Sequence, residues 1–118
     1  MVYATDPNFV TDSQSALRNA GTPAYLAVPV KAGSRTDIDT LQLSPAPPFS
    51  PIAMATGAEE TEAAQAAAGD ARLLLHYPSH TWFGWTATRV TAIRSSTYPH
   101  LKGQEFDTRQ FKQWLTAP

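Results

Sequence analysis

The strongest hydrophobic pattern in the chain lies between Arg72 and Arg94. A short apolar run, Leu73–Tyr77, is followed by the turn-forming residues Pro78–Thr81 and then by Trp82–Ile93, which is rich in aromatic and β-branched side chains. Two such runs around a turn predict a β-hairpin, because β-branched side chains fit a pleated sheet better than a helix. We expect this hairpin to form the centre of the fold.

Two further runs, residues 24–31 and 36–43, alternate along the chain and predict two more strands. Pro29 has no N–H to donate to a neighbouring strand, which indicates an edge position or the end of a strand. The alternation of the second run is irregular near Asp39, which indicates either a bulge there or a strand that begins there.

Two segments in the first part of the chain carry helix signals. Thr11 and Gln14 form a capping-box pattern that predicts a short helix, which ends before Gly21. Residues 56–69 are rich in Ala and Glu and favour a second helix with only a thin alanine face for packing. A mobile acidic segment is the alternative for residues 56–69.

The C-terminal helix has the best-specified start. Asp107 and Gln110 form a capping box, and Phe106 and Phe111 occupy the positions of a hydrophobic staple. Three apolar side chains then recur at helical spacing and give one apolar face: Phe111, Trp114 and Leu115.

Two segments are predicted to lie outside the regular elements. Residues 1–8 are interpreted as an N-terminal arm. Residues 44–55 hold four prolines, which favour an extended conformation that cannot join the interior of a sheet. This stretch is either a stiff connector across the domain or an arm that contacts another subunit through Phe49 and Ile52.

The order of these elements predicts a single α+β domain over residues 1–118. We expect a small, mostly antiparallel sheet of about four strands around the central hairpin, residues 72–94, with three short helices. A small β-barrel with peripheral helices is the alternative.

Composition narrows the classes of protein to consider. The net charge is −1, so no overall electrostatic field attracts the chain to nucleic acid or to an anionic membrane. Without cysteine there is no disulfide, thiolate metal site or cysteine nucleophile. We see no signal peptide and no apolar run near the ~20 residues of a transmembrane helix. We therefore expect a soluble protein, cytoplasmic or otherwise intracellular, or part of an assembled particle, with no membrane partner.

Candidate chemistry is sparse. His76 and His80 are four residues apart, but Pro78 between them makes a shared helix face unfavourable. Across a turn the two rings can still approach, so a small metal-dependent or hydrolytic enzyme that uses them is one alternative. No nucleophile motif or glycine-rich phosphate loop supports it. We expect no catalytic residue, no cofactor and no metal.

The aromatic cluster offers a different alternative. Trp82 and Trp85, with Arg89 and Arg94 nearby, are the residue types that single-stranded nucleic-acid-binding proteins use for base stacking and phosphate contacts. The two tryptophans have opposite strand parity, so we expect one in the core and one on an outer face. On a weakly charged surface, an outward aromatic side chain favours a protein contact instead.

The sequence therefore predicts a non-enzymatic protein–protein interaction or assembly subunit. We expect it to contact copies of itself or another protein, for example as a structural component of a homo-oligomeric particle such as a virion. The candidate interface residues are Phe49, Ile52, Trp82, Trp85, Tyr98 and Arg89.

Overall fold

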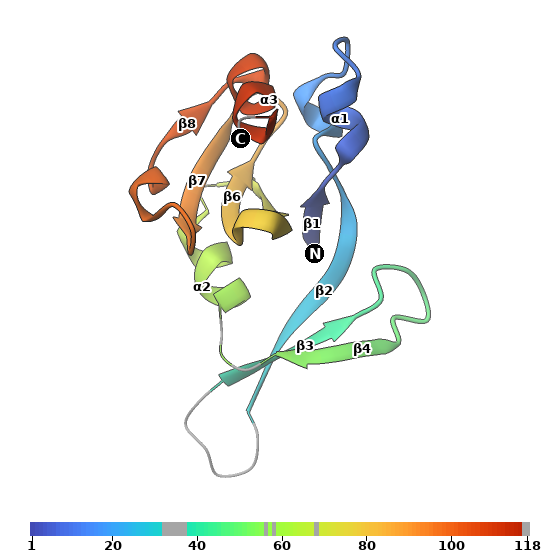
Figure 1. Ribbon diagram of the computed structural model, residues 1–118. Helices are drawn as coiled ribbons and strands as arrows, with labels where there is room; N and C mark the ends of the chain where they lie inside the picture. Colours follow the sequence, from blue (N-terminus) through green and yellow to red (C-terminus); the bar gives the residue numbers. More distant parts are fainter. Residues whose placement is uncertain (32–37, 56, 58, 68, 117–118) are drawn as a thin grey trace.

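Eight strands form one mixed sheet in the order β4-β3-β2-β1-β5-β6-β7-β8 (Figure 1). The computed structural model describes residues 1–31, 38–55, 57, 59–67 and 69–116. β1 and β5 run parallel and the other neighbouring strands run antiparallel. The sheet is open, with β4 and β8 at its edges. The strands are β1 (Val2–Thr5), β2 (Gly21–Lys31), β3 (Ile38–Leu43), β4 (Pro51–Ala55), β5 (Arg72–His76), β6 (Thr81–Trp85), β7 (Val90–Ser95) and β8 (Glu105–Phe106).

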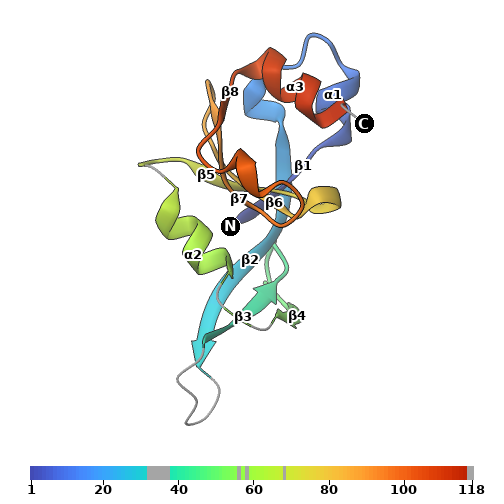
Figure 2. The same ribbon diagram turned by 60° about the vertical axis from the view of Figure 1, so that its left-hand side comes forward.

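Helices cover both faces of the central strands, as Figure 2 shows. α1 (Pro7–Thr11) and α3 (Thr108–Thr116) pack against one face, and α2 (Glu59–Ala66) packs against the other. Three short 3-10 turns complete the described elements: η1 (Leu17–Asn19), η2 (Tyr77–Ser79) and η3 (Pro99–Leu101). No helix in the described part of the chain has the length and hydrophobicity of a membrane span.

Because both faces are covered, the central strands contribute to two hydrophobic cores. In β5, Leu74 points into the first core while Leu73 and Leu75 point into the second, which is why this strand is apolar at successive residues rather than at alternate ones. The buried members of the first core are Phe9, Leu17, Ala20, Leu74, Phe83, Trp85, Val90, Ala92, Leu101 and Phe111. Those of the second are Val2, Tyr25, Ala63, Leu73, Leu75 and Trp82.

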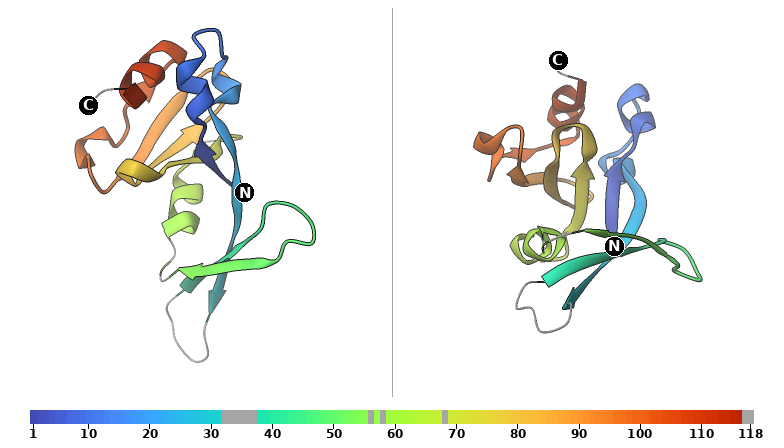
Figure 3. Two further views of the ribbon diagram at one scale, coloured as in Figure 1. Left: turned by 45° about the vertical axis from the view of Figure 1, so that its right-hand side comes forward. Right: turned by 60° about the horizontal axis from the view of Figure 1, so that its bottom comes forward.

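β2 connects the body of the protein to a projecting part of the sheet. Residues Gly21–Tyr25 pair with β1, and residues Leu26–Lys31 pair with β3. The second half of β2, together with β3 and β4, extends away from α1 and α3 (Figures 1 and 3), and the molecule measures 49 × 33 × 28 Å. We call this part of the sheet, residues 26–31 and 38–55, the arm. Pro29 lies in the half of β2 that pairs with β3 alone, where one side of the strand has no partner and a proline is tolerated as on an edge strand.

The predicted sheet of about four strands is wrong, and because the sheet is not closed the barrel alternative is wrong as well. Val2–Thr5, predicted as an arm, is β1. Pro51–Ala55, predicted as connector, is β4, and it tolerates Pro51 because it is an edge strand. The expected second strand of the hairpin is two strands, β6 and β7, and β8 was not predicted at all.

A turn after Trp85 separates β6 from β7. The N–H of Thr86 donates to the carbonyl of Arg89 over 2.9 Å, and the Thr86 hydroxyl accepts from the N–H groups of Thr88 and Arg89. Threonine bonds its own neighbouring backbone readily, so residues with high strand propensity form a turn here. The predicted pairing of the central hairpin is present between β5 and β6.

The first helix does not lie where its capping pattern predicted. Asp6 accepts a hydrogen bond from the N–H of Asn8 over 2.9 Å, and Pro7 occupies the first turn. α1 therefore ends at Thr11, where the helix was predicted to begin. Within residues 56–69, the described helix is α2, and Thr56 itself lies outside the described residues.

The C-terminal helix begins as predicted. The Asp107 N–H donates to Gln110 Oε1 over 3.0 Å, and the Gln110 N–H donates to Asp107 Oδ1 over 2.8 Å. The staple side chains Phe106 and Phe111 have ring centroids 6.1 Å apart. The capping box and the staple are confirmed.

Candidate interaction surface

The arm is a three-stranded antiparallel sheet whose register fixes which side chains share a face. Leu26 lies opposite Leu43, and Val28 opposite Leu41. Leu41 in turn lies opposite Met54. Directly opposed residues point to the same side of a sheet, so these side chains form one apolar surface. We call it the outer face: Leu26, Val28, Val30, Leu41, Leu43 and Met54, with Asp39 opposite Val30 at one end.

The other side of the arm, the inner face, is turned toward α2. Ala27 and Pro29 on this side line a groove together with residues of α2. The Thr40 hydroxyl donates to the carbonyl of Gly57 over 2.8 Å, and the N–H of Gly57 donates to Asp39 Oδ1 over 3.2 Å. These bonds hold the described backbone just after β4 against β3.

Within the described residues, the outer face belongs to neither hydrophobic core. Met54 is 58% exposed and Val28 is 37% exposed. The described residues of the arm carry only two charged side chains, Lys31 and Asp39. Monomeric proteins rarely leave a large contiguous apolar surface exposed to water. The outer face is therefore a candidate interaction site.

The edge strand of the arm is poorly suited to pairing with another strand. Pro51 lacks an N–H, and the register between β3 and β4 shifts between Gln42 and Leu43. Prolines and bulges are features that protect sheet edges from strand addition. The outer face, rather than the edge of β4, is therefore the surface available for a partner.

The loop between β3 and β4, residues 44–50, presents a single aromatic side chain. Phe49 is 43% exposed and its backbone has φ = 57°, in the left-handed region. A bulky residue is unfavourable there. The loop is held by two backbone hydrogen bonds, from Ser44 N–H to the Ser50 carbonyl at 2.8 Å and from Phe49 N–H to the Ala46 carbonyl at 2.9 Å.

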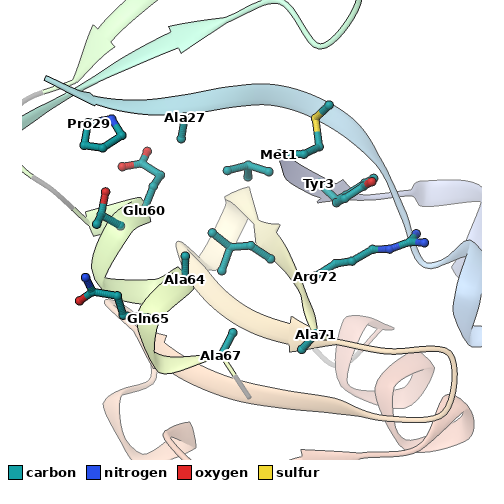
Figure 4. Close-up of a pocket in the computed structure, with 13 residues that line it drawn as sticks. Met1, Tyr3, Ala27, Pro29, Glu60, Ala64, Gln65, Ala67, Ala71 and Arg72 are labelled. Carbon is teal, nitrogen blue, oxygen red and sulfur yellow. The ribbon is translucent and has the colours of Figure 1, made fainter. Parts of the chain in front are cut away.

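A groove of about 560 Å³ lies between α2 and strands β1, β2 and β5 (Figure 4). Much of its lining consists of small apolar side chains, including Ala27, Ala64 and Ala67, and Figure 4 places Glu60 and Arg72 at opposite ends. Since α2 faces the sheet with alanines, it leaves this space unfilled. We call this cavity the α2 groove.

One buried polar contact fixes α2 beside the groove. The Tyr25 hydroxyl donates to Glu60 Oε1 over 2.9 Å, and both residues are buried. Burial raises the pKa of Tyr25 well above its ordinary value, and the hydrogen bond to Glu60 raises it further. Tyr25 is therefore a neutral donor at physiological pH, which leaves the carboxylate paired.

The predicted interface residues divide into exposed and buried ones. Ile52 is 60% exposed on the arm, Phe49 is exposed at its tip, and Tyr98 is exposed beside η3. Arg89 is exposed in the turn after β6, where it forms an ion pair of 3.5 Å with Glu105.

The two tryptophans are not available for contacts with other molecules. Trp82 is 1% exposed in the second core, and Trp85 is 2% exposed in the first. Their opposite strand parity was predicted, but the expected exposed face does not exist because both sides of the sheet are covered. Buried rings cannot stack on bases, and Arg94 of the nucleic-acid alternative forms an ion pair of 3.3 Å with Glu62.

The histidines do not form a metal centre in the described part of the chain, which contains no cluster of three or more ligands. His80 lies 2.5 Å from Glu59, measured from Nε2 to Oε1, on the surface. His76 Nδ1 lies 2.7 Å from the Ser79 hydroxyl, and burial lowers the pKa of this imidazole. A neutral imidazole can accept a proton from serine, so this pair is the closest approach to enzyme chemistry.

The surroundings of this pair fit a structural role. Ser79 is 6% exposed, and its hydroxyl also lies 2.7 Å from that of Thr81, which in turn lies 2.7 Å from that of Ser95. Among the described residues, no carboxylate forms a hydrogen bond with His76 that would orient it as a base. The hydroxyl chain satisfies buried polar groups around η2.

Sequence reasoning missed Val28 and Met54 as surface residues. The alternation of residues 24–31 was visible in the sequence, but it does not say which side the rest of the protein covers. Only the register with β3 and β4, together with the position of α2 on the opposite side, shows that this apolar face lies outside both cores.

No known protein family matches this chain, and no curated protein or solved structure is similar to it.

Proposed function

We propose that this protein is a non-enzymatic assembly subunit of a homo-oligomer, of the kind that builds virions and other particles. The observation that carries the proposal is the apolar outer face of the projecting arm, which belongs to neither core in the described residues. Burial of apolar side chains such as Val28 and Met54 against a neighbouring copy is favourable at about 25 cal/mol per Å².

A second copy is the partner that the charge distribution favours. The described arm has one cationic and one anionic side chain, and the whole chain has a net charge of −1. Two copies therefore meet with little long-range repulsion. A nucleic-acid partner would require exposed cations and accessible aromatic rings, and the tryptophans are buried.

The test is the oligomeric state of two matched variants. Met54→Lys places a charge on the outer face, whereas Ala53→Lys places the same charge on the next residue of β4, on the opposite side of the arm. Both positions are exposed, so both variants should unfold at the wild-type denaturant midpoint.

We expect the wild-type protein to associate in a concentration series by light scattering coupled to size exclusion. Met54→Lys should shift it to the monomer, and Ala53→Lys should leave association unchanged. A wild-type chain that remains strictly monomeric at high micromolar concentration would refute the proposal, as would equal association of the two variants.

A further inference from the structure

The outer face alone is too small for a stable interface. Three strands about 4.8 Å apart, each contributing about five residues at 3.3 Å, project roughly 14 × 17 Å, or about 240 Å². Even doubled for side-chain relief, this area is well below the ~800 Å² per partner of a standard interface. A neighbouring copy must therefore contact a second surface.

We propose that the Phe49 loop, residues 44–50, inserts into the α2 groove of a second copy, so that subunits join head to tail. The inference rests on the self-association proposed above and adds its geometry: one element of each subunit enters a different element of the next. Such a contact is heterologous, and it produces a closed ring or an open chain depending on the rotation between subunits.

The loop is built to present an apolar side chain. Glycine or asparagine would suit the left-handed backbone at position 49, yet the chain has an aromatic residue there with 43% of its surface exposed. Backbone strain and apolar exposure at one position point to a functional role. The hydrogen bonds that hold the loop lower the entropy lost when it binds.

The α2 groove has the complementary properties. Its volume of about 560 Å³ is within the ~300–1,000 Å³ range of ligand sites, and small side chains such as Ala64 and Ala67 leave room for an aromatic ring. The loop contains no charged residue, which matches the apolar centre of the groove.

The loop and the groove do not meet within one chain. Phe49 is not among the residues that line the groove. Figures 1 and 3 show the loop between β3 and β4 extending away from α2. The aromatic side chain and the cavity are thus left free on separate parts of each subunit, as a head-to-tail contact requires.

Two variants separate the two halves of the contact. Phe49→Asn removes the ring while suiting the left-handed backbone, so it should fold at least as well as wild type. Ala64→Trp fills the groove from an exposed position of α2. The matched control is Ala66→Trp, an exposed position of the same helix that does not line the α2 groove.

We expect Phe49→Asn and Ala64→Trp each to weaken self-association about tenfold or more, the loss expected for one buried aromatic ring, while Ala66→Trp associates like wild type. A mixture of Phe49→Asn and Ala64→Trp should form a complex of two copies and nothing larger. The intact loop of one variant enters the intact groove of the other, and no further site remains.

The outcomes separate this inference from the proposed function. If wild type associates and Met54→Lys does not, but Phe49→Asn and Ala64→Trp behave like wild type, then the head-to-tail contact is wrong and the assembly role stands. A mixture that stays monomeric also overturns the head-to-tail contact, because that contact predicts pairing between the intact loop of one variant and the intact groove of the other. A symmetric interface, by contrast, cannot be restored by mixing the two variants. A strictly monomeric wild-type chain overturns both proposals.

Discussion

Tyr25 donates its phenolic hydrogen to Glu60 Oε1 across 2.9 Å of protein interior, and this bond joins β2 to α2 at the base of the arm. Tyr25 belongs to the second core, and Glu60 lines the α2 groove. The same contact therefore holds the position of α2 and satisfies a buried carboxylate.

Tyr25→Phe is expected to reduce the free energy of unfolding by about 1–3 kcal/mol, because a buried acceptor loses its partner. Chemical denaturation measures this loss. Tyr98→Phe, at an exposed tyrosine, is the control and should leave the midpoint unchanged. If Tyr25→Phe is as stable as wild type, the bond contributes nothing to stability and another group holds α2 in place.

The start of the C-terminal helix was predictable because the interaction that fixes it is local, although the similar pattern at Thr11 and Gln14 did not mark a helix start. Asp107 and Gln110 are three residues apart, so their mutual hydrogen bonds depend only on the helix itself. The strand count failed at β1, β4 and β8. β1 pairs with β5, which is distant in sequence. β8 has two residues, and β4 begins with a proline, so neither carries a strand pattern.

The candidate interaction surface was predictable only in part. Phe49 and Ile52 stood out as apolar residues in a proline-rich stretch, and both are exposed. Trp82 and Trp85 were misassigned because the alternation of a strand says which residues share a face, but not which faces are covered. That depends on the helices packed on either side of the sheet.

His76→Asn is expected to make the free energy of unfolding depend less on pH below about pH 6.5. Burial lowers the pKa of His76 below its ordinary value of 6.5, so near that pH the folded state binds fewer protons than the unfolded state. The contribution of neutral His76 to the free energy of unfolding is therefore complete above about pH 6.5 and is lost as the pH falls below it. Asparagine keeps an acceptor for the Ser79 hydroxyl without a titrating group.

Denaturant unfolding from about pH 7.5 to about pH 5.5 measures this difference. The wild-type midpoint should fall more steeply than that of His76→Asn. Parallel profiles for the two proteins would show that His76 titrates alike in the folded and unfolded states.

Trp114→Ala is expected to reduce the free energy of unfolding by about 2 kcal/mol or more. Replacing a fully buried Trp by Ala costs about 3–5 kcal/mol, and Trp114 is half-buried. Its ring lies 5.3 Å from that of Phe83 and 5.1 Å from that of His76, centroid to centroid, which ties α3 to the sheet. Thermal or chemical denaturation provides the measurement. Gln113→Ala, an exposed position of α3, is the control; equal midpoints for the two variants would mean that α3 packs only loosely on the sheet.

The self-association proposed here should depend only weakly on salt. Lys31 and Asp39 are the charged residues among the described positions of the arm, and the Phe49 loop has none, so few ion pairs contribute to the contact. Salt screens exposed charges but does not weaken apolar burial, and sulfate strengthens such burial. Sedimentation equilibrium at about 50 mM and about 500 mM sodium chloride should therefore give similar association constants, with a higher value when sulfate replaces chloride.

Association that falls steeply with salt would identify an electrostatic interface and contradict the apolar one. Oligonucleotide binding at low salt that is lost at high salt would instead favour nucleic acid as the partner.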